Sequence, residues 1–460
     1  MNTTDNSPRE LNVDVLVIGW GKGGKTFAGA MAGKGKSVAI VERSAAMYGG
    51  TCINIGCVPT KDLIDSAEHR RPEDDPREWF TASVASRDAL ISKLNAANHA
   101  MLEGKVTLID GTARFTGPHD VEVVNGEETM TVTADTIIID TGSTTVRPPI
   151  EGLDLPGVHD STSIQHVDPL PERLAIIGGG FIGCEFASMF AQYGSKVTVL
   201  DAGEEFLPRL DRDIAEQVHQ TLTEDHGVDI RLGATVSKVD KDEDGLAVVL
   251  EDGQVGADAV LLAIGRRPAT DDLGCEAAGV ELDDRGAVVV DDQLRTSQEH
   301  IFAVGDVNGG PQFTYISLDD NRIVWDALHD GPRRRSDRVA VPSTTFITPP
   351  LAQVGLTRDE ARSKGVDALV ASKEVASIAA MPRPKILGQT RGTIRLVVDA
   401  SSHEILGATI FSVDAQELIN LVSLAMRQHV TAEDLRDGIW THPSSTEAFN
   451  EVLSDLQPIG

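Results

Sequence analysis

Two cysteines five residues apart are the part of this sequence best suited to chemistry. Cys52 and Cys57 lie in a glycine-rich stretch, residues 49–61, that ends at Lys61. A close cysteine pair in a reducing compartment is more often catalytic or metal-binding than a structural disulfide. A metal site usually needs four ligands, and no second cysteine pair or neighbouring histidine accompanies these two. The spacing therefore favours a redox pair that alternates between dithiol and disulfide.

A glycine-rich turn between a strand and a helix precedes the cysteines. Residues 13–18 form a run of buried-strand type, and the turn that follows contains Gly19, Gly21 and Gly24. These glycines fit the pattern G-x-G-x-x-G, in which the backbone approaches a pyrophosphate at a helix N-terminus. The next strand ends at Glu42, whose carboxylate can accept hydrogen bonds from a ribose diol.

The same pattern occurs a second time. Residues 173–177 lead into Gly178, Gly180 and Gly183, and the strand after the next helix ends at Asp201. Each position lies 159 residues after its counterpart in the first copy. One fingerprint is weak evidence because ordinary strand-to-helix turns also contain glycine, but two copies at a fixed interval predict two dinucleotide sites.

The order of the two copies predicts which dinucleotide each one binds. A flavin accepts a hydride and passes electrons to sulfur, which nicotinamide alone does poorly. FAD is therefore expected at the first copy, beside the cysteines, and a nicotinamide nucleotide at the second. Asp201 favours the ribose 2′-hydroxyl of NADH over the 2′-phosphate of NADPH, and the nearest basic residue is Arg209. NADH is therefore preferred over NADPH in this prediction.

Two lysines and two further cysteines are expected to have no chemical role. Lys22 and Lys25 could meet phosphate charge, but we expect both to be solvated surface residues. Cys184 and Cys275 have no partner nearby in the sequence and are expected to be packing thiols.

Length and composition limit the class of protein. A chain of 460 residues exceeds one hydrophobic core and should form roughly three domains. A net charge of −30 would repel nucleic acid and anionic membrane surfaces, so neither is expected as a partner. Residues 1–10 are expected to be a disordered tail without the features of a signal peptide. No apolar run approaches the roughly 20 residues of a membrane span, so we expect a cytoplasmic protein.

The sequence pattern predicts further elements between and after the two copies. Residues 62–104 are expected to be helical, with a polar break at 71–76. The strands expected from apolar runs are residues 106–109, 121–124, 136–142, 259–264, 344–347, 393–398 and 405–410. The alternating strands that begin near residue 341, together with helices at 415–428 and 431–437, predict a separate α+β domain.

With these elements in place, the chain resembles the class I flavoprotein disulfide reductases of the pyridine nucleotide–disulfide oxidoreductase family. Relatives in that family include dihydrolipoyl dehydrogenase, glutathione reductase and mercuric reductase. The resemblance covers nearly the whole chain and is carried by both fingerprints and by residues 50–52, 57–61, 305–306, 348–357 and 441–447. The residues most similar to the reactive-chlorine-resistance branch, described as a flavin-dependent copper(II) reductase, are 19–26, 46–50, 312–320 and 348–350.

The resemblance implies an α/β fold with two Rossmann-like dinucleotide-binding domains, for FAD and NAD, and a C-terminal α+β dimerisation domain. The expected domains are a first FAD-binding part at 11–149, an NAD-binding domain at 150–268, a second FAD-binding or central part at 269–340, and a dimerisation domain at 341–460. The residues expected to bind FAD are Gly19, Gly21, Gly24, Glu42, Gly50, Thr51, Thr141, Gly142, Gly305 and Asp306. The residues expected to bind NAD are Gly178, Gly180, Phe181, Gly183, Asp201 and Gly265.

The resemblance also implies roles for the residues around the redox pair. Cys52 would be the exposed interchange thiol, and Cys57 would be the thiol beside the flavin. Lys61 and Glu185 would pair near the flavin. Phe181 would stand where the family usually has a tyrosine that gates the nicotinamide pocket, so the hydroxyl of that gate is missing.

A histidine near the C-terminus is the expected proton partner of the cysteines. The resemblance implies that His442 and Glu447 form an acid–base dyad and that the peptide bond between His442 and Pro443 is cis. It also implies a homodimer in which His442 of one subunit reaches the cysteines of the other.

The expected activity is electron transfer from NAD(P)H via FAD and the Cys52–Cys57 disulfide to an acceptor. A metal ion such as Cu(II), or an oxidant-linked substrate in oxidative-stress defence, is the first expectation for that acceptor, and no metal ligands are assigned. Two alternatives stay open. One is dihydrolipoyl dehydrogenase, and the other is a flavin-bearing redox sensor or complex subunit with little turnover.

Overall fold

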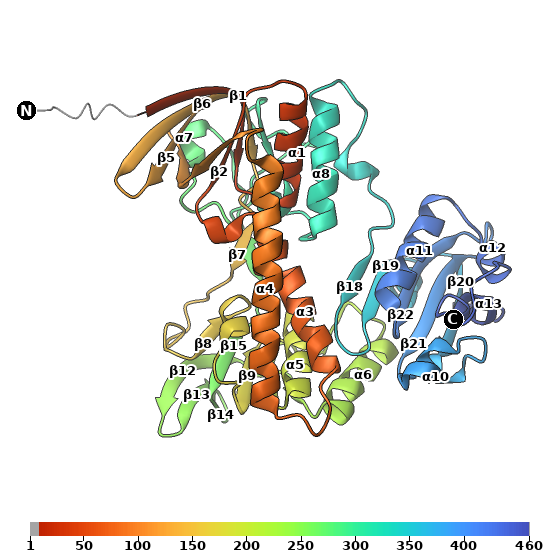
Figure 1. The fold of residues 1–460 in the computed structure, drawn as a ribbon. Helices are drawn as coiled ribbons and strands as arrows, with labels where there is room; N and C mark the ends of the chain where they lie inside the picture. Colours follow the sequence, from red (N-terminus) through yellow and green to blue (C-terminus); the bar gives the residue numbers. More distant parts are fainter. Residues whose placement is uncertain (1–8, 460) are drawn as a thin grey trace, which may run out of the picture. The chain divides into compact units, whose positions relative to one another are not determined.

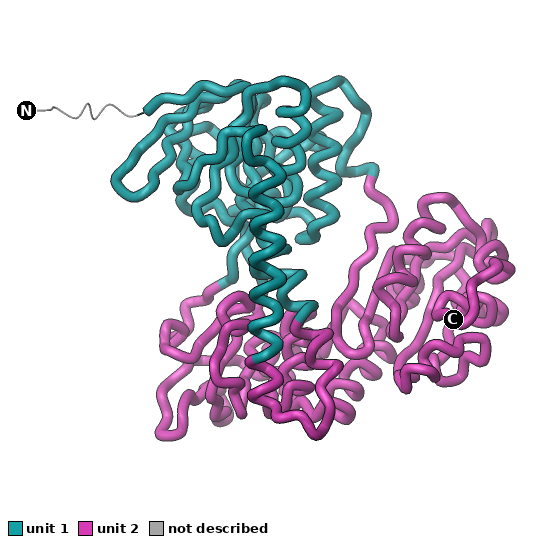
Figure 2. Tube along the Cα trace, in the orientation of Figure 1, with its two compact units in different colours: residues 1–62, 82–146, 265–337 teal, residues 63–81, 147–264, 338–460 magenta. Residues whose placement is uncertain are grey.

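The computed structural model describes residues 9–459, which divide into two compact units (Figures 1 and 2). Unit 1 contains the described residues up to 62 together with 82–146 and 265–337, and unit 2 contains 63–81, 147–264 and the residues from 338 onward. Helices α3 (Cys57–Glu68) and α4 (Pro76–Leu102) each run from one unit into the other, and the predicted polar break separates them. Residues 1–8 of the expected tail lie outside the described residues, whereas Arg9 and Glu10 begin the first strand.

A mixed sheet forms the centre of unit 1. Its strands lie in the order β3-β2-β1-β6-β5-β4, and β17 pairs with the end of β6. The pairs of β1 with β2 and β6, of β2 with β3 and of β6 with β17 are parallel, while β5 pairs antiparallel with β4 and β6. The strand bounds are β1 (Arg9–Ile18), β2 (Val38–Glu42), β3 (Thr107–Asp110), β4 (Thr112–Phe115), β5 (Asp120–Asn125), β6 (Glu128–Ile139) and β17 (Ile301–Ala303).

Both faces of this sheet are covered, because successive side chains of its central strands face opposite sides and are apolar on both. Val15 and Val17 of β1 pack in one apolar cluster with helices α1 (Lys22–Gly33) and α8 (Thr314–Ala327). Leu16 and Ile18 join a second cluster that includes residues of β4 and β5. The shorter elements of unit 1 are η1 (Ala45–Met47), α2 (Thr51–Asn54), β7 (Ser143–Thr145), β16 (Arg266–Pro268), α7 (Cys275–Ala278), η4 (Gly305–Asn308) and η5 (Arg335–Asp337).

A parallel sheet in unit 2 repeats the strand, turn and helix of unit 1. The strands, in spatial order, are β11 (Asp229–Arg231), β10 (Lys196–Leu200), β9 (Arg173–Ile177), β15 (Ala259–Leu262) and β8 (Val158–Asp160). Its helical elements are η2 (Ser163–His166), α5 (Phe181–Tyr193), α6 (Arg212–Gln220) and the π-helical turn η3 (Thr221–Asp225). An antiparallel sheet that the sequence did not predict follows, with strands β12 (Val236–Asp242), β13 (Gly245–Leu250) and β14 (Gly253–Ala257).

The α+β arrangement of strands and helices predicted after residue 341 is confirmed in the second part of unit 2. Helix α11 (Ala415–Arg427) packs on a sheet that, in spatial order, contains β18 (Ser343–Thr345), β19 (Leu351–Gly355), β22 (Ile405–Phe411), β21 (Thr393–Asp399), β20 (Ala368–Glu374) and β23 (Gln457–Pro458). The other helical elements are α9 (Arg358–Ser363), η6 (Val375–Ser377), α10 (Arg383–Leu387), α12 (Ala432–Arg436) and α13 (Ala448–Val452). None of the helices in residues 9–459 has both the length and the apolar character that a membrane crossing requires.

A buried ion-pair network joins the loop before α6 to strand β21 within unit 2. The guanidinium of Arg395 is 4% exposed, and it contacts Asp211, which is fully buried, at 2.6 Å. Its other terminal nitrogen contacts Asp213 at 2.5 Å. Although burial opposes it, hydrogen bonding to Arg395 and the charges of Arg395 and Arg358 lower the pKa of Asp213 to about 2. Asp211 and Arg395 thus compensate each other's charge away from water.

Removal of one member of this buried pair should destabilise unit 2 strongly. Asp211→Ala is expected to lower the free energy of unfolding by about 3 kcal/mol, because the buried Arg395 charge would lose its buried partner and keep Asp213, which is half-exposed, as its carboxylate partner. Urea denaturation followed by circular dichroism measures the change. Asp437→Ala, which breaks the exposed Arg436–Asp437 pair, should cost less than about 1 kcal/mol. Equal effects of the two substitutions would contradict the assignment.

Candidate functional site

The first glycine turn packs directly on the carboxylate of Asp140. Side-chain carbons at Gly21 and Gly24 would overlap this carboxylate, with the one at Gly24 only 2.5 Å from Oδ2. The backbone N–H of Gly24 donates to the same oxygen at 2.8 Å. Gly21 caps α1 without a side-chain hydrogen bond, and the amide of Gly23 donates to the hydroxyl of Ser317 at 2.9 Å, so the first turn of α1 attracts an anion mainly through the positive end of the helix dipole. This glycine cradle fits the pyrophosphate of a dinucleotide.

The loop that carries the redox pair rests on this glycine turn, backbone against backbone. Gly50 has φ +81°, and a side-chain carbon there would lie 2.9 Å from Cα of Gly21. Only glycine tolerates both the conformation and the close approach. Cys52 follows as the second residue of α2, and Cys57 is the first residue of α3. The structure therefore brings together the first fingerprint and the cysteine pair within unit 1, as the sequence predicts.

The strongest influence on the acidity of each thiol is its hydrogen-bonding interaction with the other thiol. It lowers the pKa of Cys52 to about 6, and Thr314, Lys25 and Lys61 act in the same direction against the effect of burial. The same bond, burial and the charge on Cys52 raise the pKa of Cys57. The pair therefore loses its first proton easily and holds the second, which gives one thiolate beside one thiol near neutral pH.

The two cysteines differ in exposure as whole residues. Cys57 is exposed, whereas Cys52 is half-exposed. The assignment of interchange and flavin-side roles to the two thiols stays a prediction.

Thr314 is a neighbour of the redox pair that sequence reasoning missed. Its hydroxyl lies 3.8 Å from Sγ of Cys57, and Thr314 is the first residue of α8. The residue belongs to the stretch 312–320, which served only as a family signature. A separation of 257 residues from Cys57 leaves no local pattern that would have found this contact.

The remaining residues predicted to bind FAD lie around the same turn in unit 1. A side-chain carbon at Gly142 would lie 3.9 Å from the hydroxyl of Thr51. Asp306, after Gly305, accepts a hydrogen bond from the hydroxyl of Ser143 at 2.6 Å. The hydroxyl of Thr141 donates to the carbonyl of Ala269 at 2.9 Å. Glu42 ends β2 and is buried, which raises its pKa, and it accepts a hydrogen bond from the amide of Ser44 at 3.2 Å.

The second glycine turn in unit 2 has the same features. Gly180 caps α5 without a side-chain hydrogen bond, and a side-chain carbon there would meet no atom within 4 Å. Asp201 accepts hydrogen bonds from the amides of Gly179 and Gly203 at 2.6 and 2.7 Å. A carboxylate has about four acceptor positions, so capacity for a ribose diol remains. Open space at Gly180 and an acid beside the turn fit a nicotinamide dinucleotide.

The other residues predicted for this nucleotide follow the same turn. A side-chain carbon at Gly183 would overlap the carbonyl of Gly178, so the helix can approach the strand only without one. At Gly265 it would meet no atom within 4 Å. Phe181 begins α5 and is 39% exposed, as an aromatic gate requires.

Glu185 is buried on α5 and binds a backbone group of the same unit. Its Oε1 accepts a hydrogen bond from the amide of Phe346 at 2.8 Å. Lys61 lies on α3. The predicted pairing of Lys61 with Glu185 stays a prediction.

The predicted acid–base dyad is assembled in unit 2. Nδ1 of His442 lies 2.9 Å from Oε1 of Glu447, and the His442 side chain is 73% exposed. The amide of Ser444 donates to the other oxygen of Glu447 at 2.8 Å. This bond and the one to His442 lower the pKa of Glu447, which stays ionised and orients the imidazole. The peptide bond between His442 and Pro443 is cis, which confirms that prediction.

Two other predictions on individual side chains have opposite outcomes. Cys184 and Cys275 are buried, at 1% and 5% exposure, which confirms them as packing thiols. Lys25 is also buried, so its expected solvation is wrong: its ammonium donates to the side chain of Asn98 on α4 and to the backbone carbonyl of Gly49 in the cysteine loop.

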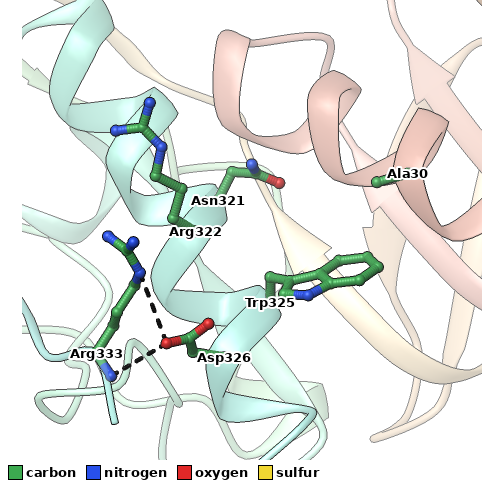
Figure 3. Close-up of a pocket in the computed structure, with 6 residues that line it drawn as sticks. All are labelled: Ala30, Asn321, Arg322, Trp325, Asp326 and Arg333. Atoms are coloured by element: carbon green, nitrogen blue, oxygen red, sulfur yellow. Dashed lines mark hydrogen bonds and ion pairs between the residues drawn. The ribbon is translucent and has the colours of Figure 1, made fainter. Parts of the chain in front are cut away.

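A pocket of about 340 Å³ lies on unit 1 (Figure 3). Ala30 of α1 and residues of α8 and the following loop line it, and Arg333 contacts Asp326 there at 3.6 Å. No residue predicted for catalysis or cofactor binding contributes to this pocket.

The fold and the site define a class of protein, and comparison with known proteins agrees. The family described as pyridine nucleotide-disulphide oxidoreductase matches residues 13–320, and its dimerisation domain matches residues 341–453. The chain belongs to this family. It is an FAD-dependent oxidoreductase that uses a pyridine nucleotide, and the predicted family and fold class are confirmed.

Particular relatives place the chain more closely within the family. It is 44% identical to RclA, a probable pyridine nucleotide-disulfide oxidoreductase of Escherichia coli K12, over 95% of this chain and 98% of that protein. It is 33% identical to dihydrolipoyl dehydrogenase of Bacillus subtilis, over 96% of each protein. A Cu(II) complex of the HOCl-induced flavoprotein disulfide reductase RclA from Escherichia coli superposes with a TM-score of 0.92 at 44% identity, over 96% of this chain and 99% of that one. The predicted branch is thereby confirmed.

The lowered pKa of Cys52 predicts how the alkylation of this residue depends on pH. In the reduced protein, the rate of iodoacetamide addition to Cys52 should rise with pH about a midpoint near 6, because the thiolate is the nucleophile. Peptide mass spectrometry at stepped pH measures the label on each cysteine. The buried Cys184 and Cys275 should stay unlabelled and serve as internal controls. A midpoint near the ordinary thiol value of about 8.5 would refute the prediction.

Proposed function

We propose that this chain is an NADH-dependent flavoenzyme whose Cys52–Cys57 pair delivers electrons to a metal ion such as Cu(II) or to an oxidant-linked acceptor. The observation that carries the proposal is the backbone contact of Gly50 with Gly21, which holds the redox pair against the first dinucleotide turn. The similarity to RclA, one of whose structures is a Cu(II) complex, supports the choice of acceptor.

The residues that would hold FAD are those grouped around the first turn of unit 1. They are Gly19, Gly21, Gly24, Glu42, Gly50, Thr51, Thr141, Gly142, Gly305 and Asp306. When bound, FAD accepts a hydride from the nicotinamide and supplies two electrons to sulfur. The carboxylates of Glu42 and Asp306 offer acceptors for its hydroxyls, and the positive N-terminal end of the α1 dipole attracts its phosphates.

The cysteines then carry the electrons to the acceptor. Reduction of the disulfide by two electrons and one proton yields one thiolate and one thiol. Return to the disulfide releases two electrons and one proton, which reduces two Cu(II) ions to Cu(I). In this proposal the metal ion meets the sulfurs as a substrate. Within residues 9–459, no three or more His, Cys, Asp or Glu side chains are grouped so that they could hold a metal ion.

His442 would move the proton in this cycle. Glu447 holds its Nδ1, which leaves Nε2 as the ring nitrogen for proton exchange with a thiol. The match of the dimerisation domain supports a homodimer, and we propose that His442 of one subunit serves the cysteines of the other.

An acceptor panel tests the proposed function. Purified holoenzyme should oxidise NADH with Cu(II) faster than with lipoamide, glutathione disulfide or oxygen, as followed by absorbance at 340 nm. Cys52→Ser should abolish turnover with disulfides because the attacking sulfur is lost, while Cys275→Ser, at a buried packing thiol, should not. Fast lipoamide turnover would instead favour dihydrolipoyl dehydrogenase, which the 33% identity to that enzyme keeps as the second candidate. No turnover with any acceptor would favour a low-turnover redox sensor.

Asp201 is the proposed basis of NADH preference. Its carboxylate would repel the 2′-phosphate of NADPH and accept from the 2′-hydroxyl of NADH. Asp201→Asn should therefore lower the ratio of kcat/KM for NADH over NADPH by about tenfold, which corresponds to about 1.4 kcal/mol. Asp229→Asn, at an exposed carboxylate on the neighbouring strand, should leave the ratio unchanged. An unchanged ratio in Asp201→Asn would contradict this assignment.

A further inference from the structure

Asp140 is a buried acid directly after β6, in contact with the turn that is proposed to hold FAD. The residue is only 5% exposed. Its Oδ2 accepts a hydrogen bond from the amide of Gly24 at 2.8 Å, and its Oδ1 would overlap a side-chain carbon at Gly21. Both glycines belong to the fingerprint whose backbone approaches a pyrophosphate. The two oxygens of Asp140 therefore lie against the turn that meets this anion, and all of these residues belong to unit 1.

The first turn of α1 donates two of its amides to side chains of the protein. Gly24 donates to Asp140, and Gly23 donates to the hydroxyl of Ser317 at 2.9 Å. A phosphate at this turn therefore depends on other donors and on the charges nearby. A protonated carboxyl group offers an O–H donor, whereas an ionised carboxylate offers only acceptors and a negative charge. The protonation state of Asp140 thus decides whether this residue attracts or repels the pyrophosphate.

Two other acids stand beside Asp140 and oppose its ionisation. Asp320 of α8 is fully buried, and it accepts a hydrogen bond from the amide of Gly305 at 2.7 Å. Oδ1 of Asp140 would lie 3.7 Å from a side-chain carbon at that glycine, and Asp306 is the next residue in the chain. Burial first, and then the charges of Asp306 and Asp320, raise the pKa of Asp140 well above its ordinary value.

Two interactions lower the pKa of Asp140, and within residues 9–459 neither is a direct ion pair. The hydrogen bond from the amide of Gly24 is the stronger of them, and the charge of Lys25 is the weaker. The Lys25 ammonium donates its own hydrogen bonds to the side chain of Asn98 and the carbonyl of Gly49. A buried carboxylate is costly unless a cation pairs with it, so the neutral carboxyl group is favoured.

The pyrophosphate of FAD would bring further negative charge to this cluster of acids. We propose that Asp140 is a further residue of the FAD site, where it receives the pyrophosphate as a neutral carboxyl group. Where Asp140 is ionised before FAD binds, it takes up one proton from water on binding and returns that proton when FAD leaves. The inference rests on the proposed placement of FAD at the first turn.

Retention of FAD at stepped pH tests this assignment. Purified holoenzyme is diluted, and the released FAD is measured by its fluorescence. Because the neutral form of Asp140 binds, the dissociation constant should rise about tenfold for each pH unit above the pKa of Asp140 in the protein without FAD. Asp140→Asn stays neutral at every pH, so it should keep the low-pH affinity of the parent throughout. Asp135→Asn, at an exposed acid on β6, should follow the parent profile.

A second variant decides the proposal if Asp140→Asn does not fold. Asp140→Ala is also neutral, but it lacks the acceptor for the amide of Gly24. It should therefore bind FAD more weakly than the parent does at low pH, with an affinity that does not change as the pH rises. Circular dichroism identifies the variants that fold.

Three results would overturn the proposal. The first is a parent affinity that does not change with pH, and the second is a neutral variant whose affinity falls with pH as the parent's does. The third is loss of FAD from folded Asp140→Asn at every pH, which would show that the ionised carboxylate is required. None of these readouts involves the terminal acceptor. Failure of the acceptor panel, combined with a pH dependence that Asp140→Asn removes, would therefore reject the proposed acceptor and retain the role of Asp140.

Discussion

The close approach of Gly50 to Gly21 is the contact on which the arrangement of the site depends. Two backbones meet where a side-chain carbon would lie 2.9 Å from the opposing Cα, and Gly50 adopts a φ of +81° that other residues rarely tolerate. Because of this contact, the same turn that fits a pyrophosphate also supports the residues leading into Cys52. This one backbone contact therefore fixes the position of the cysteine loop relative to the dinucleotide turn, and no flexible side chain lies between the two backbones.

The parts of this structure that could be predicted from sequence are those encoded locally. Each strand–turn–helix copy lies within about 30 residues, and its glycines are required by contacts inside that segment. For the same reason β21, β22, α11 and α12 appear where apolar alternation and periodicity place them. The sheet of β12, β13 and β14 was missed because its strands contain glycines, as in Gly253–Ala257, or charges, as in Val236–Asp242. These strands gain their stability from pairing and burial, which propensity does not encode.

The residues of the site that belong to local motifs could be predicted from the sequence. The residues that tertiary packing brings next to those motifs could not. Cys52, Cys57 and the glycines follow from spacing, whereas Thr314 reaches Cys57 from 257 residues away. Lys25 shows the limit most clearly. A lysine directly after the last glycine of the turn is expected to be solvated, yet it is buried and donates a hydrogen bond to Asn98, 73 residues later on α4. Burial of a charged residue is a property of tertiary packing, so a charge that matters to chemistry can look ordinary in the sequence.

The chain is strongly acidic, and its negative charges would be expected to disfavour a further negative charge on the thiolate of the redox pair. Surface carboxylates act weakly on the site, because salt screens exposed charges beyond a Debye length of roughly 8–10 Å. A buried ammonium is screened much less, and its interaction grows as the local dielectric constant falls. The charges of Lys25, which is 6% exposed, and of Lys61 lower the pKa of Cys52 although the whole chain carries a net charge of −30. The electrostatics of the redox pair follow from which charges are buried beside it, and the net charge of the chain says little about them.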